Sequence, residues 1–273
     1  MTAPGAGRQQ APIGVFDSGI GGLTVARAIL QHLPDESIIY FGDTARVPYG
    51  PKSPATVERY AREITEFLLA EGVKAIVVAC NTATAHALPT LVAESPVPVI
   101  GVVEPGARAA VAAAPHGTVG VIGTAGTIAS GAYDRAIRAL APDVEVLTRA
   151  CPLFVPLVEE GWIDHEATRI VAHQYLDEFA ASGLDALVLG CTHYPLLTPL
   201  LGDVMGPGTQ LIDSAEQTAI ELAARLDAAG LRAPAGSPVR HRFIASDAPE
   251  QMLRLGQRFL GAPIERVERV ILG

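Results

Sequence analysis

"VVACNTATAHALP" (residues 77–89) and "LVLGCTHYPLLTP" (residues 187–199) follow one pattern. Each is an apolar run that ends in a cysteine, continues into hydroxyl or amide side chains and reaches a proline a few residues later. The chain contains three cysteines, and two of them, Cys80 and Cys191, occupy these matching positions. We therefore interpret the two stretches as one structural element that occurs twice.

Two further pairs of stretches repeat in the same order. "GVFDSGIGGLTV" from Gly14 resembles "GVIGTAGTIASG" from Gly120, and "VIGVVEPGARAAVAAA" from Val99 resembles "LIDSAEQTAIELAARL" from Leu211. All three matches have nearly the same spacing, which predicts an internal duplication. The alternative is the general similarity that any two βα units share. A duplicated α/β unit predicts two lobes around a cleft, related by a pseudo-two-fold axis.

Short strands alternate with longer amphipathic helices along the chain. The strands are near-continuous Val, Ile and Leu runs, typical of buried parallel strands, and their alternation with helices indicates βαβ units. The predicted fold class is α/β, with two pseudo-symmetric lobes, each a mainly parallel sheet flanked by helices, and the active site in the cleft between them. We predict strands at about residues 13–17, 37–42, 73–79, 98–103, 118–122, 144–149, 185–190, 209–212, 239–245 and 264–271. The predicted divisions are a flexible N-terminal tail (1–11), lobe 1 (12–100 plus 212–273) and lobe 2 (101–211).

Composition argues against several classes of protein. The chain has 273 residues, 49% of them hydrophobic and 18% charged, so it can bury a substantial core. A formal net charge of -9 argues against a nucleic-acid partner, because phosphate binding needs clustered Lys and Arg. No apolar run approaches the ~20 residues that span a bilayer, and the start of the chain lacks the apolar core of a secretory signal. An odd number of cysteines without disulfide-like spacing fits a reducing cytoplasm, so we expect a cytoplasmic protein without membrane contact.

The two matched thiols can act as bases. Each stands where a predicted strand ends and a helix begins, and the exposed N–H groups there stabilise negative charge and can lower a thiol pKa. One free cysteine in such a place is more often packing, but two at matched positions point to function. In parallel sheets ligands bind beyond the carboxyl ends of the strands, so Cys80 and Cys191 are expected to face one cleft from opposite lobes. Inversion of a stereocentre without a redox cofactor needs such a pair, one base on each face of the carbon.

The glycine-rich turn "FDSGIGG" (residues 16–22) is expected to contact the ligand. Asp17 and Ser18 end the first strand, and the glycines allow a close backbone approach. Thr24 stands where a dinucleotide-binding G-x-G-x-x-G turn needs glycine, and a phosphate-binding lysine is absent. In the repeat, Thr124 is expected to mirror Ser18.

Three other features have weaker signals. Tyr49 and Gly50 lie in a proline-rich loop that can close over a small ligand. Cys151 has no partner in the repeat and is interpreted as packing. His193 lies two residues after Cys191, but no C-x-x-C or matched histidine pair supports a metal site, so we expect no metal.

The motifs "FDSGIGG", "VPYG", "VACNTA", "CPLFVPLVEEG" and "GCTHYP" together resemble those of bacterial glutamate racemases, in the cofactor-independent aspartate/glutamate racemase family. The resemblance implies that Cys80 deprotonates D-glutamate and Cys191 deprotonates L-glutamate. It implies that Asp17 assists Cys80, and that Glu159 and His193 assist Cys191. It also implies a reaction without a cofactor, a supply of D-glutamate for peptidoglycan, and a homodimer. The substrate contacts that it implies are Asp17, Ser18, Tyr49, Gly50, Asn81, Thr82, Thr124, Thr192 and His193.

Three alternatives stay open at this point. The substrate can be aspartate or another small acid, because the residues that set specificity cannot be read from one sequence. A two-lobed protein can also bind an amino acid without turnover. A redox role for the thiols is the third alternative, although a bond between Cys80 and Cys191 would block the cleft.

Overall fold

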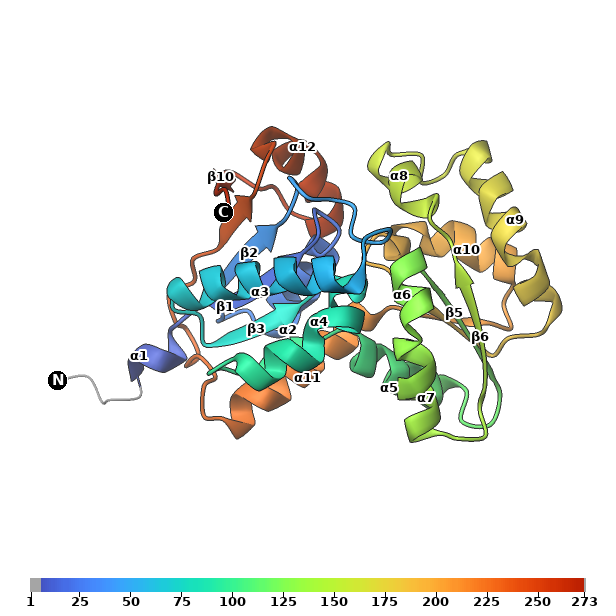
Figure 1. Ribbon diagram of the computed structural model, residues 1–273, viewed down its shortest axis with the longest axis horizontal. Helices are drawn as coiled ribbons and strands as arrows, with labels where there is room; N and C mark the ends of the chain where they lie inside the picture. Colours follow the sequence, from blue (N-terminus) through green and yellow to red (C-terminus); the bar gives the residue numbers. More distant parts are fainter. Residues whose placement is uncertain (1–5, 273) are drawn as a thin grey trace.

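Two α/β lobes make up the computed structural model, which describes residues 6–272 (Figure 1). All the strand pairs are parallel, in two sheets of order β10-β9-β2-β1-β3-β4 and β6-β5-β7-β8. The first sheet contains β1 (Ile13–Asp17), β2 (Ile38–Gly42), β3 (Ala75–Val78), β4 (Val99–Gly101), β9 (Arg242–Ala245) and β10 (Glu268–Arg269). The second contains β5 (Thr118–Gly123), β6 (Glu145–Ala150), β7 (Ala186–Gly190) and β8 (Gln210–Ile212).

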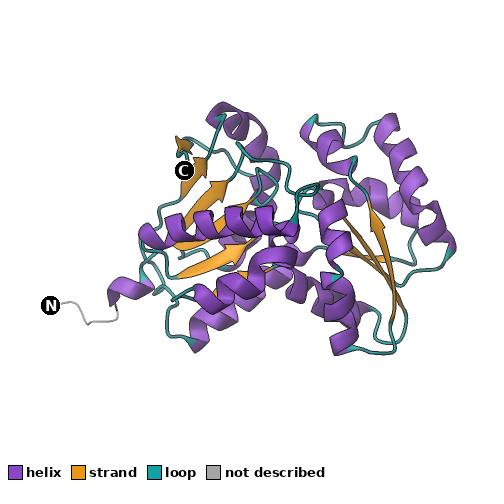
Figure 2. Cartoon of the chain, in the orientation of Figure 1, coloured by secondary structure: helices purple, strands orange, loops and turns teal. Residues whose placement is uncertain are grey.

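Helices flank both sheets, as Figure 2 shows in purple around the orange strands. This cover on both faces explains why β1, β2, β3 and β7 are buried at every residue. The helices near the first sheet in sequence are α1 (Ala6–Gln9), α2 (Leu23–His32), α3 (Pro54–Ala70), α4 (Asn81–Glu94), α11 (Ser214–Ala228) and α12 (Pro249–Leu260). Those near the second are α5 (Val103–Ala113), α6 (Ala125–Ser130), α7 (Ala132–Leu140), α8 (Phe154–Glu159), α9 (Glu166–Ala181), the 3₁₀ helix η1 (Tyr194–Leu197) and α10 (Thr198–Met205).

The internal duplication is visible in the strand order. The order β2-β1-β3-β4 in the first sheet recurs as β6-β5-β7-β8 in the second. The register recurs as well, since Phe16 pairs with Val78 and Ile122 pairs with Leu189. Two residues after each of these pairs, both lobes have a hydroxyl residue and a cysteine just beyond the strand ends. These are Ser18 and Cys80 in the first lobe, and Thr124 and Cys191 in the second.

The first sheet differs from the second by two added strands at one edge. All ten predicted strands are present, but the predicted strands 239–245 and 264–271 are reduced to Arg242–Ala245 and Glu268–Arg269. The last strand, β10, lies at the edge of the sheet and pairs with one neighbour only. Its two residues, Glu268 and Arg269, are both charged, which is typical of a short edge strand. Neither added strand reaches the region between the lobes in Figure 1.

The start of the chain was expected to be a flexible tail over residues 1–11. Residues 1–5 lie outside the described residues, whereas Ala6–Gln9 form α1. The buried Lys74 side chain donates a hydrogen bond to the Gln9 carbonyl and forms an ion pair with Glu36. The predicted lobe boundaries stay a prediction, and β4 and β8 each cross one of them.

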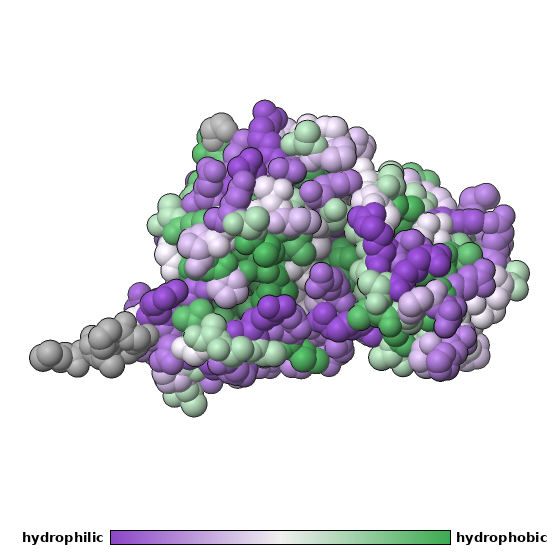
Figure 3. Space-filling view, turned by 60° about the horizontal axis from the view of Figure 1, so that its bottom comes forward, coloured by the Kyte–Doolittle hydropathy of each residue, from purple (hydrophilic) through white to green (hydrophobic). Residues whose placement is uncertain are grey.

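The helices of residues 6–272 include none with the length and hydrophobicity that crossing a bilayer requires. On the face of the molecule in Figure 3, hydrophilic residues interrupt the hydrophobic ones over both lobes.

Candidate active site

Both matched thiols are buried at the carboxyl ends of equivalent strands. Cys80 follows β3 and caps α4, whose Ala83 N–H donates to the Cys80 sulfur at 3.5 Å. Cys191 follows β7, but the next helical element is η1, which begins only at Tyr194. The expected helix start is therefore present at Cys80 and replaced by a 3₁₀ turn at Cys191.

The two thiols line one cavity between the lobes, of about 40 Å³. A space of this size holds a few water molecules, so an amino acid can enter only if the lobes separate. The structure thus brings Cys80 and Cys191 together as the duplication predicted. The residues that line this inner cavity are Ser18, Gly19, Val47, Pro48, Tyr49, Gly50, Cys80, Asn81, Thr82, Thr124, Val155, Cys191, Thr192 and His193.

Burial raises the pKa of both thiols in this closed arrangement. The pKa of Cys80 is raised to about 11 by burial first and by the nearby charge of Asp17 second, against the lowering effect of hydrogen bonds from Ala83 and Ser18. The pKa of Cys191 is also raised by burial, against a hydrogen bond from the His193 backbone. The expectation of a lowered thiol pKa is therefore wrong for the closed arrangement of the lobes, because desolvation outweighs the helix terminus.

Asp17 and Ser18 lie next to Cys80. The Cys80 thiol donates to the Ser18 hydroxyl oxygen at 3.6 Å. The Asp17 carboxylate is 1% exposed, and it accepts hydrogen bonds from the Gly19 N–H at 2.9 Å and from the Thr192 hydroxyl at 3.5 Å. Burial raises the Asp17 pKa. The charge of this buried carboxylate also acts on the Cys80 thiol, which makes Asp17 a candidate for proton exchange.

A histidine and a glutamate extend from Cys191. The Cys191 sulfur lies 4.0 Å from His193 Nδ1, and His193 Nε2 lies 2.9 Å from Glu159 Oε1. The ring of Phe259 packs edge-on against the imidazole at 5.2 Å between centroids and helps to hold it. Glu159 is the last residue of α8, so this chain of three groups joins two elements of the second lobe. It can pass a proton between the thiol and the carboxylate.

Hydroxyl and amide groups from both lobes meet beside the thiols. The Thr82 hydroxyl of α4 lies 2.8 Å from that of Thr124 and 3.1 Å from that of Thr127 in the second lobe. Asn81 also faces the other lobe, where the Tyr133 hydroxyl donates to its Oδ1 at 2.7 Å. Thr127 and Tyr133 carry no recognisable motif, and sequence reasoning assigned them no role. Their positions depend on how the lobes dock.

The loop after β2 contacts the second lobe through Gly50, whereas the hydroxyl of Tyr49 bonds within the first lobe. Tyr49 is 1% exposed and lines the cavity of the thiols, and its hydroxyl donates to the Asp43 carboxylate. A Cβ atom added to Gly50 would lie 2.9 Å from Thr124 Cβ. Gly50 therefore permits contact between this loop and the second lobe.

Gly21 of the "FDSGIGG" turn is a second point of close approach. A Cβ atom there would lie 2.3 Å from the Thr192 hydroxyl oxygen and 2.4 Å from His193 Nδ1. Both distances are far below van der Waals contact, so only glycine fits while the lobes are closed. This turn was expected to approach a ligand, and in the structure Gly21 contacts the opposite lobe.

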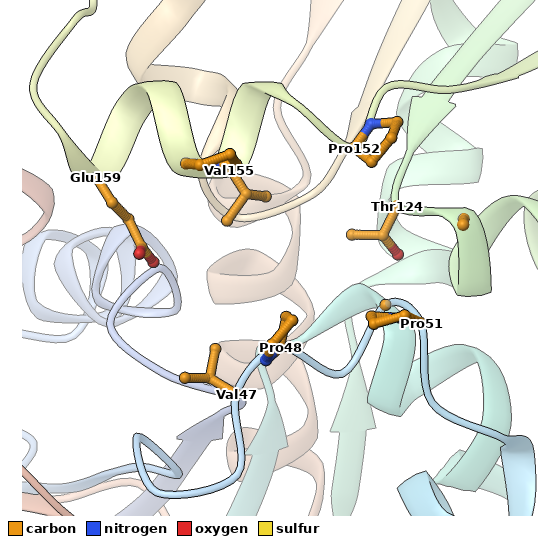
Figure 4. A pocket seen from close by; sticks show the side chains of 10 residues that line it. Val47, Pro48, Pro51, Thr124, Pro152, Val155 and Glu159 are labelled. Carbon is orange, nitrogen blue, oxygen red and sulfur yellow. The ribbon is translucent and has the colours of Figure 1, made fainter.

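A larger pocket of about 420 Å³ adjoins the cavity at the mouth between the lobes (Figure 4). Val155 and Glu159 project into it from α8, opposite the loop that carries Val47 and Pro48. Thr124 and Gly50 line this pocket as well as the inner cavity. The mouth therefore leads from solvent to the thiols.

No cluster of three or more His, Cys, Asp or Glu side chains arranged to hold a metal ion occurs between residues 6 and 272. Cys151 is buried in the core of the second lobe, among the apolar residues that pack around Phe154 and Tyr194.

Comparison with known proteins gives consistent matches. The family model described as Asp/Glu/Hydantoin racemase matches residues 13–222. The chain is 53% identical over 260 residues to a glutamate racemase of Geobacter metallireducens, covering 95% of this chain and 96% of that protein. It superposes on glutamate racemase RacE1 of Bacillus anthracis with a TM-score of 0.93, at 42% identity over 97% of this chain and 98% of the other. A glutamate racemase of Francisella tularensis in complex with D-glutamate gives a TM-score of 0.90, at 39% identity with the same coverage.

Proposed function

This chain belongs to the Asp/Glu/hydantoin racemase family, and we propose that it is a glutamate racemase that works with two thiols and no cofactor. The observation that carries the proposal is the placement of Cys80 and Cys191, which line one cavity from equivalent positions of two duplicated lobes. A substrate held between them would have one sulfur on each side of its α-carbon. The glutamate racemase relatives and the D-glutamate in one of them support glutamate as the substrate.

In the reaction, one cysteine thiolate removes the α-proton and the electron pair of the C–H bond moves into the substrate carboxylate. The opposite thiol then gives its proton to the other face of the α-carbon, which inverts the stereocentre. Cys80 is the base for D-glutamate and Cys191 is the base for L-glutamate. After one turnover the thiol and the thiolate have exchanged places, and the reverse reaction restores them.

The thiols must ionise before they can act as bases. The substrate ammonium group brings a positive charge between the lobes, and a nearby opposite charge lowers the pKa of a thiol. In the proposed mechanism Asp17, whose charge acts on Cys80, exchanges a proton with that thiol, and His193, 4.0 Å from the Cys191 sulfur, exchanges one with Cys191. Glu159 stabilises the imidazolium that forms when His193 takes up the proton.

Glutamate would be held mainly by hydrogen-bond donors. Its two carboxylates are acceptors only, and the cavity offers hydroxyl, amide and backbone N–H groups. Asp17 does not line the closed cavity, and it is the proposed acceptor for the ammonium group once the lobes open. The remaining proposed substrate contacts are Ser18, Tyr49, Gly50, Asn81, Thr82, Thr124, Thr192 and His193.

The proposed role follows from the product. D-Glutamate made by this chain would enter peptidoglycan precursors, and the enzyme would act in the cytoplasm as a homodimer. The paired strand ends form a complete two-thiol site within one chain, so we expect the chemistry itself to need one protomer only.

Incubation with L-glutamate in deuterated water tests the proposal. Circular dichroism should decay to zero, while proton NMR should report deuterium at the α-carbon of both enantiomers. Aspartate, serine and alanine under the same conditions should keep their optical activity. Retained optical rotation and an unexchanged α-proton with glutamate would rule out racemisation, whereas calorimetric binding without exchange would identify an amino-acid-binding protein.

A further inference from the structure

The side chain of Asn81 needs a fixed orientation to bind an anionic substrate. It is the residue after Cys80, it is 3% exposed, and it lines the cavity between the thiols. Its amide has a donor end, the NH₂ group, and an acceptor end, the carbonyl oxygen. A substrate carboxylate is attracted by the donor end and repelled by the acceptor end, so a 180° flip of the amide would turn a binding contact into a repulsive one.

We propose that Tyr133 is a positioning residue that selects the productive orientation of the Asn81 amide. Its hydroxyl donates to Asn81 Oδ1 at 2.7 Å, which uses the acceptor end of the amide and leaves the NH₂ group for the cavity. Tyr133 itself does not line the cavity, and it acts on the substrate through Asn81.

The phenol is held rigidly where it meets the amide. Tyr133 is 2% exposed, and its ring lies against Gly190, where an added Cβ would come within 3.2 Å of the ring. Its hydroxyl lies against Gly106, where an added Cβ would also come within 3.2 Å. Burial raises the pKa of Tyr133, so the phenol keeps its proton and stays a donor at neutral pH.

The hydrogen bond crosses from one lobe to the other. Tyr133 belongs to α7 of the second lobe and Asn81 to α4 of the first, so a separation of these two helices would break the contact. Opening for substrate entry would release the amide, and closure would set it again. Tyr133 therefore links lobe closure to the formation of the carboxylate contact.

The inference rests on the proposed racemase function and is tested with the purified chain and D-glutamate. Tyr133→Phe keeps the ring and removes the hydroxyl. The KM for D-glutamate and the calorimetric Kd should rise about threefold to tenfold, the range expected for one buried neutral hydrogen bond, while kcat changes little. Tyr175→Phe is the matched control, because the hydroxyl of this tyrosine of the same lobe accepts from the Leu153 N–H, and Tyr175 does not line the cavity. It should leave KM unchanged.

A double-mutant cycle separates positioning from general damage. In an Asn81→Ala background, Tyr133→Phe should have no further effect on KM, since the amide that it orients is gone. An equal KM increase in both backgrounds would overturn the inference. So would a parental KM in Tyr133→Phe.

Gly106→Ala is a second variant that displaces the phenol without removing it. Alanine favours the helix at this position of α5, but its Cβ would also lie 3.1 Å from Ser214 Cβ, so the melting temperature is measured beside KM. Its Cβ would lie 3.2 Å from the Tyr133 hydroxyl, so KM for D-glutamate should rise in a protein that is still folded at the assay temperature. Unchanged KM in Gly106→Ala and Tyr133→Phe refutes the role of Tyr133 but leaves the racemase proposal intact. A parent chain that neither binds nor racemises glutamate refutes both.

Discussion

His193 Nε2 lies 2.9 Å from Glu159 Oε1, on the side of the imidazole away from Cys191. The carboxylate therefore orients the ring and favours a proton on Nε2, which leaves Nδ1 as the acceptor facing the thiol. No equivalent histidine faces Cys80, whose neighbours are a carboxylate and a serine. The duplicated fold thus supplies two thiols with different partners.

Glu159→Gln should slow racemisation by about 10²-fold, because it removes the charge that stabilises the His193 imidazolium. L- and D-glutamate have equal free energies, so kcat/KM must fall equally in both directions. The variant should instead change the primary deuterium isotope effect on kcat/KM unequally. This isotope effect should increase more with α-deuterated L-glutamate, the substrate of Cys191, than with α-deuterated D-glutamate. Glu160→Gln, at the exposed neighbour of Glu159, is the control and should match the parent.

Replacement of either matched cysteine by alanine should abolish racemisation, with a loss of at least about 10³-fold. Cys191→Ala should still exchange the α-proton of D-glutamate in deuterated water, because Cys80 remains. Cys80→Ala should exchange that of L-glutamate only. Cys151→Ala controls for loss of a buried thiol outside the cavity and should racemise glutamate normally. A fully active Cys80→Ala or Cys191→Ala variant would contradict the two-base mechanism.

The ligand-free protein should lose stability at alkaline pH. The pKa of Cys80 is raised from 9.0 to about 11, so the folded state holds the thiol proton more tightly than the unfolded state does. The resulting stability is fully present below about pH 9 and is lost as the pH rises toward 11, by about 1.4 kcal/mol for each unit in that window. Melting temperatures measured from pH 7 to 10.5 should fall at alkaline pH, and Cys80→Ala should reduce the slope. Identical slopes in the two proteins would contradict the raised pKa.

Local patterns predicted the duplicated frame well. The strand runs, the matched positions of Cys80 and Cys191 and the mirrored Ser18 and Thr124 are all properties of short stretches, and the common register of β1–β3 and β5–β7 preserves them in space. The direction of the thiol pKa shift was not predictable in this way. It depends on burial, and the opposite lobe provides much of that burial.

Contacts between the lobes are the part of the site that the sequence conceals. Tyr133 and Asn81 are 52 residues apart, and Thr192 and Asp17 are 175 apart. Nothing in the local sequence of Tyr133 indicates that its hydroxyl reaches the other lobe. The glycines of "FDSGIGG" illustrate the same limit, since their pattern indicates a tight turn but not that Gly21 faces Thr192 and His193.

Gly21→Ala should impair activity by preventing full closure of the lobes. The added Cβ would collide with the Thr192 hydroxyl and the His193 ring, two buried side chains on the segment that carries Cys191. Misplacement of a reacting group by about 1 Å can cost about 10²-fold in rate, so kcat/KM should fall by roughly that factor. The thiols should also become easier to alkylate with iodoacetamide, because the cavity stays open to solvent. Gly202→Ala is the matched control, since a Cβ at this helical glycine meets nothing within 4 Å. Parental activity and alkylation rates in Gly21→Ala would show that closure to this extent is unnecessary for catalysis.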